Sequence, residues 1–184
     1  TDANDPENEQ GLRDQNFGRL NFVRIWYSWQ LIGEEQVIGV GLFKFDLEPL
    51  VDKEVASAHL QLFSPGVVLT DAARLVDVHR VTGGEWTETG LTFNNRPTWT
   101  RDPVALGAVY GPGFWYSWDV TASVLREEER EGSISFVVGL RNIDNESGEE
   151  VVFTSREVGT NTPRLVVTYT EAPFSLSWYY WAGA

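Results

Sequence analysis

The chain contains no cysteine and no methionine among its 184 residues. Without cysteine there are no disulfides, so the redox compartment cannot be inferred from them. No apolar run approaches the roughly 20 residues of a membrane-spanning helix, which argues against a membrane span. Because the sequence starts at Thr1 and holds no initiator methionine, we expect that a signal peptide has been removed and that the protein is secreted or held at the cell surface.

Positive charge is scarce: 14 Lys and Arg residues face 27 Asp and Glu residues, giving a formal net charge of −13. Such a surface repels nucleic acid and anionic membranes, and the aromatic residues are not interleaved with basic ones. The charge also argues against an acidic polysaccharide unless arginines gather in a groove. We therefore expect no nucleic-acid partner.

Hydrophobic residues make up 42% of the chain and aromatic residues 13%, which favours a packed core over disorder. A chain of this length buries roughly two-thirds of its unfolded surface as one domain. Residues 1–15 are acidic and polar, and we expect them to form an arm. We expect a β-sandwich domain over residues 16–170 and a separate aromatic segment over residues 171–184.

Apolar residues recur with a period of two, which predicts β-strands. One short helix is expected after Val120, capped by Asp119 or Thr121. Gly39 and Gly41 predict a bulge or a close backbone approach. Short strands separated by Gly, Pro and Asn turns indicate an all-β fold, an antiparallel two-sheet jelly-roll sandwich. The expected strands are Leu20–Leu31, Val37–Leu47, Ala56–Phe63, Leu75–Val81, Leu91–Phe93, Val104–Tyr110, Trp115–Val120, Ser133–Leu140, Glu150–Ser155 and Pro163–Thr170.

Several motifs, taken in order, resemble the DNRLRE-type domain, a secreted β-sandwich with carbohydrate-binding-module character. The combination of E-W-T-E, N-N-R-P, W-Y-S-W-D-V-T and S-R-E with P-R-L-V-V-T-Y carries the resemblance. It implies a jelly-roll sandwich outside a cell, but not one function, because such domains occur in polysaccharide enzymes, adhesins and surface proteins. The matching segments are Leu42–Leu47, Ala56–Phe63, Val78–Pro97, Trp115–Ala122 and Phe153–Thr170.

The two ends of the chain depart from that family pattern. Family domains usually open with a strand of the form D-A-Y-V-R-S, whereas Thr1–Gln15 shows no apolar alternation. The pattern ends at the T-Y-T strand, yet this chain continues with an uncharged aromatic stretch. The stretch alternates like a strand, with one face formed by Phe174, Leu176, Trp178, Tyr180 and Ala182.

A missing first strand and a surplus last one suggest that the chain end fills a sandwich. It can fold back on its own domain, anchor the protein to lipid or cell wall, or enter a neighbouring molecule as a donor strand. Donation is heterologous and generates a filament. Our leading hypothesis is therefore a non-catalytic subunit of an extracellular filament whose partners are copies of itself. Further subunit contact is expected at Leu20, Phe22 and Trp26.

The alternative hypothesis is a carbohydrate-binding module that acts as a monomer or as an appendage of an enzyme. Sugar binding needs an aromatic platform flanked by fixed hydrogen-bonding groups. Trp86 and Trp118 fall in family framework motifs and are expected in the core or at corners. Trp99 and Trp115 are the candidate platform for a polysaccharide.

The sequence offers no catalytic constellation, and we expect no enzyme activity. His59 and His79 sit in strands and are expected to be surface or satisfied residues. The carboxylates Glu85, Glu88 and Asp119 belong to turn and helix-cap positions rather than to a glycosidase pair.

No cofactor is expected. Asp119 and Asp144 are weak candidates for a structural calcium ion, since they offer hard oxygen ligands without the spacing of a calcium motif. Asn145 opens an N-glycosylation sequon, N-E-S, on the same loop as Asp144.

Overall fold

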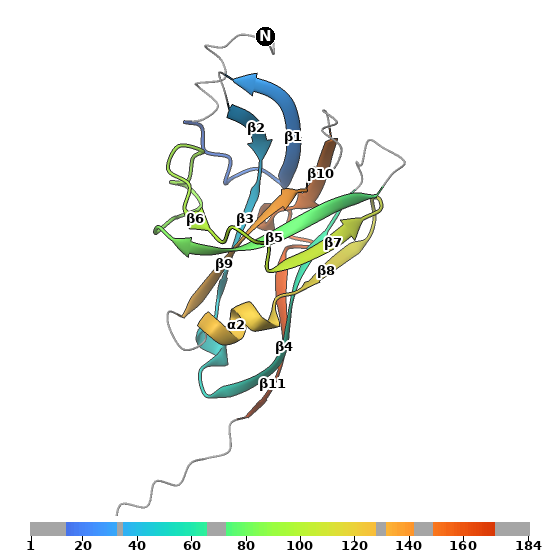
Figure 1. Cartoon of the computed structure of the whole chain (residues 1–184). Coiled ribbons are helices and arrows are strands. Elements are labelled where there is room, and N and C mark those ends of the chain that lie inside the picture. Colours follow the sequence, from blue (N-terminus) through green and yellow to red (C-terminus); the bar gives the residue numbers. More distant parts are fainter. Residues whose placement is uncertain (1–13, 33–34, 66–72, 128–131, 142–148, 172–184) are drawn as a thin grey trace, which may run out of the picture.

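The computed structural model describes residues 14–32, 35–65, 73–127, 132–141 and 149–171. Their regular secondary structure consists almost entirely of antiparallel strands arranged as a sandwich, with one short α-helix, α2 (Thr121–Glu127) (Figure 1). The fold class expected from the sequence is confirmed. The candidate donor strand Phe174–Ala184, the first thirteen residues, Asp144 and Asn145 all lie outside the described residues.

The strands pair into three groups. The first is ordered β10 (Glu149–Thr154), β1 (Phe22–Ile32), β2 (Glu35–Gly39). The second is ordered β11 (Arg164–Glu171), β4 (Lys53–Phe63), β8 (Trp115–Asp119). The third is ordered β3 (Gly41–Asp46), β9 (Ser133–Leu140), β5 (Arg74–Gly83), β6 (Thr98–Trp99), and β7 (Ala105–Val109) also pairs with β5. Two short 3-10 helices are η1 (Glu48–Leu50) and η2 (Arg156–Val158).

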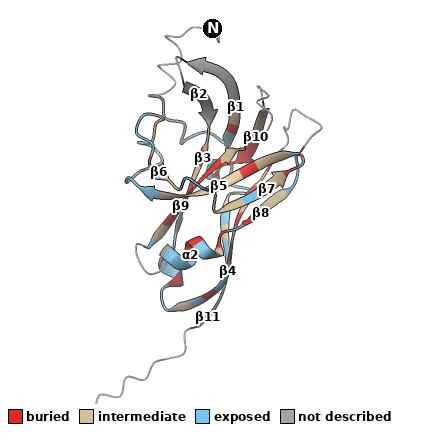
Figure 2. Cartoon of the chain, viewed as in Figure 1, coloured by how far each residue is buried: buried red, intermediate tan, exposed pale blue. Residues whose placement is uncertain are grey.

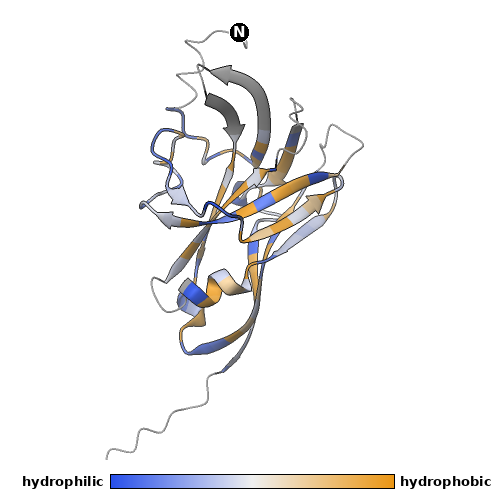
Figure 3. Cartoon of the chain, viewed as in Figure 1, coloured by the Kyte–Doolittle hydropathy of each residue, from blue (hydrophilic) through white to orange (hydrophobic). Residues whose placement is uncertain are grey.

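The core forms where the inward residues of these sheets meet. Along β4, buried positions alternate with positions that are half-buried or exposed. Hydrophobic residues occupy the buried, inward positions (Figures 2 and 3). Trp118 packs its ring edge-on against Phe153 with the ring centres 6.0 Å apart, a favourable aromatic geometry. Helix α2 contributes the buried Val124. The side chains with no exposed surface include Ile25, Leu60, Leu62, Val76, Val78, Phe136, Val138, Val151 and Phe153.

Two glycines allow tryptophan rings to lie against the backbone. A Cβ atom on Gly107 would stand 2.6 Å from Trp118 Nε1, and one on Gly39 would stand 2.2 Å from Trp26 Nε1. Both distances are shorter than any real contact of a side-chain carbon. The close backbone approach expected near Gly39 is confirmed, and the strand pattern breaks just after it, between β2 and β3.

Most expected strands are present, and β9 has the predicted bounds. The strand expected over Leu91–Phe93 is wrong, because these residues lie in an irregular loop before β6. The side chain of Asn95 holds the loop in turns: its Oδ1 accepts from Thr92 N at 2.6 Å, and its Nδ2 donates to the Gly90 carbonyl at 2.8 Å. Local side-chain bonds of this kind replace the ladder that a strand would need.

Candidate functional site

The outer face of the β11–β4–β8 group is open to solvent over a row of aromatic and polar side chains. Leu60, Leu62 and Trp118 point inward and are buried, so their strand neighbours point outward. We call this outer surface the Trp115 face. Its side chains are half-buried or exposed, and they belong to His59, Gln61, Phe63, Trp115, Ser117, Asp119, Arg164 and Val166.

The strand register brings these residues together from distant parts of the sequence. Phe63 lies opposite Trp115, Gln61 opposite Ser117, and His59 opposite Asp119. On the other side of β4, Arg164 lies opposite Gln61 and Val166 opposite His59. Cross-strand pairs are close enough to interact on one face. The face therefore carries an aromatic pair at one end and hydrogen-bonding groups along the rest.

Trp115 is held in place by two neighbours. The ring of Phe63 lies 5.5 Å from its centre at an angle of 60°. The guanidinium carbon of Arg164 lies 4.0 Å from the Trp115 ring centre, within the range of a cation–π contact. Arg164 is fixed in turn because its Nε donates to Gln61 Oε1 at 2.9 Å. The aromatic group is thus oriented before any ligand arrives.

Asp119 caps the start of α2, as the sequence predicted. Its Oδ1 accepts from the backbone N of Thr121 at 2.9 Å and from the Thr121 hydroxyl at 2.6 Å. These hydrogen bonds, with a smaller contribution from nearby His59, lower the pKa of Asp119 below its ordinary value. Asp119 is therefore a carboxylate at neutral pH and can accept hydrogen bonds from a ligand. The expectation that it caps the helix is confirmed.

The outer face of the β3–β9–β5 group, in contrast, carries a packed loop formed by residues 84–97. Trp86 reaches over β9 and donates from Nε1 to Ser135 Oγ at 3.2 Å. A contact between His79 Nδ1 and the Thr100 carbonyl, 2.8 Å long, ties the next segment to β5. Trp86 therefore has a structural contact, and Trp118 is buried in the core, as expected for both.

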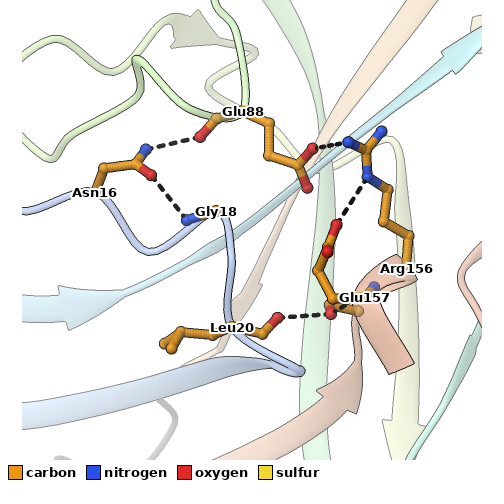
Figure 4. A network of polar contacts seen from close by, with 7 residues as sticks. Asn16, Gly18, Leu20, Glu88, Arg156 and Glu157 are labelled. Carbon is orange, nitrogen blue, oxygen red and sulfur yellow. Dashed lines mark hydrogen bonds and ion pairs between the residues drawn. The ribbon is translucent and has the colours of Figure 1, made fainter. Parts of the chain in front are cut away.

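A network around Glu88 fastens that loop to the start of the described chain (Figure 4). Asn16 Nδ2 donates to the carbonyls of Glu88 and Leu91 at 2.7 and 2.6 Å. The Glu88 carboxylate pairs with Arg156 Nη2 at 2.5 Å, and Arg156 also pairs with Glu157. Glu88 thus has a bracing role, in agreement with its expected turn position.

A shallow cavity of about 180 Å3 opens within this loop, lined by Glu85, Trp86, Thr87, Gly90, Leu91 and Asn95. It is smaller than the roughly 300–1,000 Å3 of ordinary small-molecule sites. The amide of Asn95 is already committed to Thr92 and Gly90. The Trp115 face offers more uncommitted polar groups.

The two tryptophans expected to form a platform do not lie together. Trp99 belongs to β6 and pairs with Val81 near the end of β5, whereas Trp115 belongs to β8 in another group of strands. Near Trp99, the guanidinium of Arg96 lies 3.8 Å from the Phe93 ring and 6.0 Å from the Trp99 ring. They are therefore two separate candidate positions.

The expected subunit-contact residues are only partly on one surface. Leu20 and Phe22 are about half exposed, and they line a shallow groove together with Arg19, Asn21 and Arg24. Trp26 is half-buried and does not line that groove; its ring lies against Gly39. Whether this surface meets another molecule stays a prediction.

Within the described ranges, no group of three or more His, Asp or Glu side chains is arranged to hold a metal ion. The same part of the chain contains no helix long and apolar enough to cross a bilayer. Sequence reasoning nominated Trp115 but missed Arg164, Gln61 and Ser117. The one sequence signal for them is that each alternates with apolar residues in a strand, as outward residues do.

The model of a protein family, Carbohydrate-binding module family 96, matches residues 8–169. The match spans nearly all of the domain expected over residues 16–170 and includes almost every motif that resembles the DNRLRE-type domain. The expected carbohydrate-binding-module character is confirmed. No curated protein matches the chain.

Proposed function

Because the chain belongs to carbohydrate-binding module family 96, we propose that it binds a polysaccharide and that the Trp115 face is the binding surface. Modules of this kind are generally non-catalytic and typically extracellular. Both properties agree with the expectations for this chain. We propose that the module works outside the cell and holds its ligand without changing it.

The observation that supports this surface is a fixed tryptophan beside a row of hydrogen-bonding groups on an open sheet. A sugar ring has an apolar face of C–H groups and a rim of hydroxyls, so it packs on an aromatic ring while its rim makes hydrogen bonds. The face of the Trp115 ring that Arg164 leaves uncovered supplies the apolar contact. The side chains of Ser117 and Asp119 supply a donor and acceptors on the same face.

The family match favours the alternative hypothesis from the sequence over the leading one. Nothing in the described residues or in the family supports a filament built by strand donation. The segment on which that hypothesis depends, Phe174–Ala184, lies outside the described residues. The polysaccharide is therefore the partner that we propose.

The test compares Trp115→Ala with Trp99→Ala by affinity electrophoresis and isothermal titration calorimetry. The probes are mixed-linkage β-glucan, xylan, galactomannan, polygalacturonate and methyl-esterified polygalacturonate. Both tryptophans are half-buried, so each variant removes a comparable aromatic group. We expect Trp115→Ala to weaken binding about 10- to 100-fold, the usual effect of removing a tryptophan hot spot. Trp99→Ala should bind like the wild type.

The melting temperature of each variant shows whether it is folded. If Trp99→Ala loses binding while Trp115→Ala binds fully, the binding site lies near β6 rather than on the Trp115 face. If the wild type binds none of the polysaccharides in the panel, the proposal that these ligands are its partners fails.

A further inference from the structure

Arg164 is a basic side chain that pairs with no acidic side chain among the described residues of this strongly acidic protein. The chain has 27 acidic and 14 basic residues, and Lys53, Arg24, Arg141 and Arg156 all pair with carboxylates. Among the described residues, the contacts of Arg164 are the Trp115 ring and Gln61 Oε1. No carboxylate of the described residues therefore neutralises its positive charge.

These two contacts fix the guanidinium and leave one edge of it unused. The contact with Trp115 holds the guanidinium over the ring, and the bond from Nε to Gln61 fixes one of its edges. Among the described residues, the two Nη groups form no hydrogen bond or ion pair, and the side chain is exposed. A planar guanidinium presents such donors as a fork that matches two neighbouring oxygen atoms.

We propose that Arg164 is a specificity-determining residue of the Trp115 face and that its two Nη groups donate to a pair of adjacent oxygens on a sugar ring. The pair is either two neighbouring hydroxyls or the two oxygens of a carboxylate. This inference rests on the proposed function, because it needs the ligand to lie on the Trp115 face. Gln61 is a positioning residue that acts through Arg164.

Arg96 provides a matched control elsewhere in the molecule. Its guanidinium also stacks on an aromatic ring, that of Phe93, at 3.8 Å. However, its Nη1 already donates to the Phe93 carbonyl at 2.7 Å. Arg96 thus has the same charge and a similar stacking contact, but its donors are partly used within its own turn.

The test measures the dissociation constants of Arg164→Lys, Arg164→Gln, Gln61→Leu and Arg96→Lys for the polysaccharides of the same panel. Lysine keeps the charge but loses the fork. We expect Arg164→Lys to weaken binding of the preferred polysaccharide about tenfold or more, as for the loss of hydrogen bonds from a charged donor. The order of preference within the panel should change as well. Gln61→Leu should show a smaller loss in the same direction, and Arg96→Lys should show none.

The two sources of the oxygen pair give different results. If they are hydroxyls, the lysine and glutamine variants lose affinity equally, and methyl-esterification of polygalacturonate does not weaken binding. If they belong to a carboxylate, the glutamine variant loses more than the lysine variant, and methyl-esterification weakens binding to the wild type.

The inference is overturned if Arg164→Lys keeps or gains affinity with the wild-type order of preference, while Trp115→Ala loses binding. In that case the Trp115 face is still the binding surface. If Trp115→Ala binds normally, the proposed surface itself is wrong. Melting temperatures and near-ultraviolet circular dichroism establish that each variant is folded.

Discussion

The Thr121 hydroxyl links helix α2 to strand β4, and the Asp119 carboxylate holds that hydroxyl in place. The Thr121 hydroxyl accepts a hydrogen bond from Ala58 N at 2.9 Å and donates one to Asp119 Oδ1 at 2.6 Å. The backbone N of Thr121 donates to the same oxygen. The charge of Asp119 therefore strengthens two bonds at the start of the helix.

Replacing Asp119 with alanine is expected to lower the free energy of unfolding by about 1 kcal/mol near pH 7, the usual loss when a helix cap is removed. The pKa of Asp119 is lower in the folded protein than its ordinary value of 3.8. Its contribution is therefore present above that value and disappears as the pH falls through the folded-state pKa. Urea titrations near neutral pH and in strong acid measure the difference.

The difference in the free energy of unfolding between wild type and Asp119→Ala should become smaller in strong acid, because the carboxyl is then protonated in both the folded and unfolded states. Ser117→Ala is the control, since Ser117 is exposed on the same strand. If this difference in unfolding free energy is the same at every pH, the charge of Asp119 does not stabilise the helix.

At the scale of elements, the loop of residues 84–97 depends on a residue far away in the sequence. The Asn16 side chain donates two short hydrogen bonds to backbone carbonyls of this loop, those of Glu88 and Leu91, and accepts one from Gly18 N. We expect Asn16→Ala to destabilise the protein by about 1–2 kcal/mol, since each net hydrogen bond contributes about 0.5–1.5 kcal/mol. Amide hydrogen exchange in the loop should speed up.

The control for that experiment is Asn94→Ala, which removes an exposed bond to Asp14 and should cost less. Polysaccharide binding should be unchanged in both variants, because the loop does not belong to the Trp115 face. If Asn16→Ala binds polysaccharide more weakly at unchanged stability, the loop of residues 84–97 takes part in binding and the Trp115 face is not the whole site.

The strands were predictable because their evidence is local. Alternation and turn residues set the bounds of Ser133–Leu140, which match β9. The same alternation gave the wrong result at Leu91–Phe93, because Asn16 and Asn95 bind that backbone and neither bond is visible in a pattern of hydrophobicity. Sequence periodicity reports which face a residue occupies, not which groups reach its backbone.

The candidate site was only partly predictable for a related reason. Trp115 could be nominated because aromatic residues suit sugars. Its neighbours Arg164 and Phe63 come from β11 and β4, and only the strand register places them beside it. Register depends on pairing between distant segments, which one sequence does not reveal. Trp99 looked equivalent in the sequence and lies elsewhere.

At the scale of the whole molecule, the net charge of −13 surrounds a face that we propose binds ligands by stacking and hydrogen bonds. For a neutral polysaccharide, we expect the dissociation constant to stay within about twofold between about 0.01 M and 1 M salt, although the Debye length falls from about 30 to 3 Å. Calorimetry at several salt concentrations measures this. A steep dependence would show that charge, rather than stacking, drives binding.

In β4 and β8, side chains that build the core alternate with side chains on the outer face, so residues of the outer face can be substituted without altering the core. The side chains of Leu60, Leu62 and Trp118 are buried in the core. Gln61 and Ser117 alternate with them along the strands and lie on the outer face. On the proposed binding face, substitutions at outward positions such as Gln61 and Ser117 can therefore change ligand preference with little risk to folding. One scaffold can then diversify, in nature or in the laboratory, by substitutions on a single side of three strands.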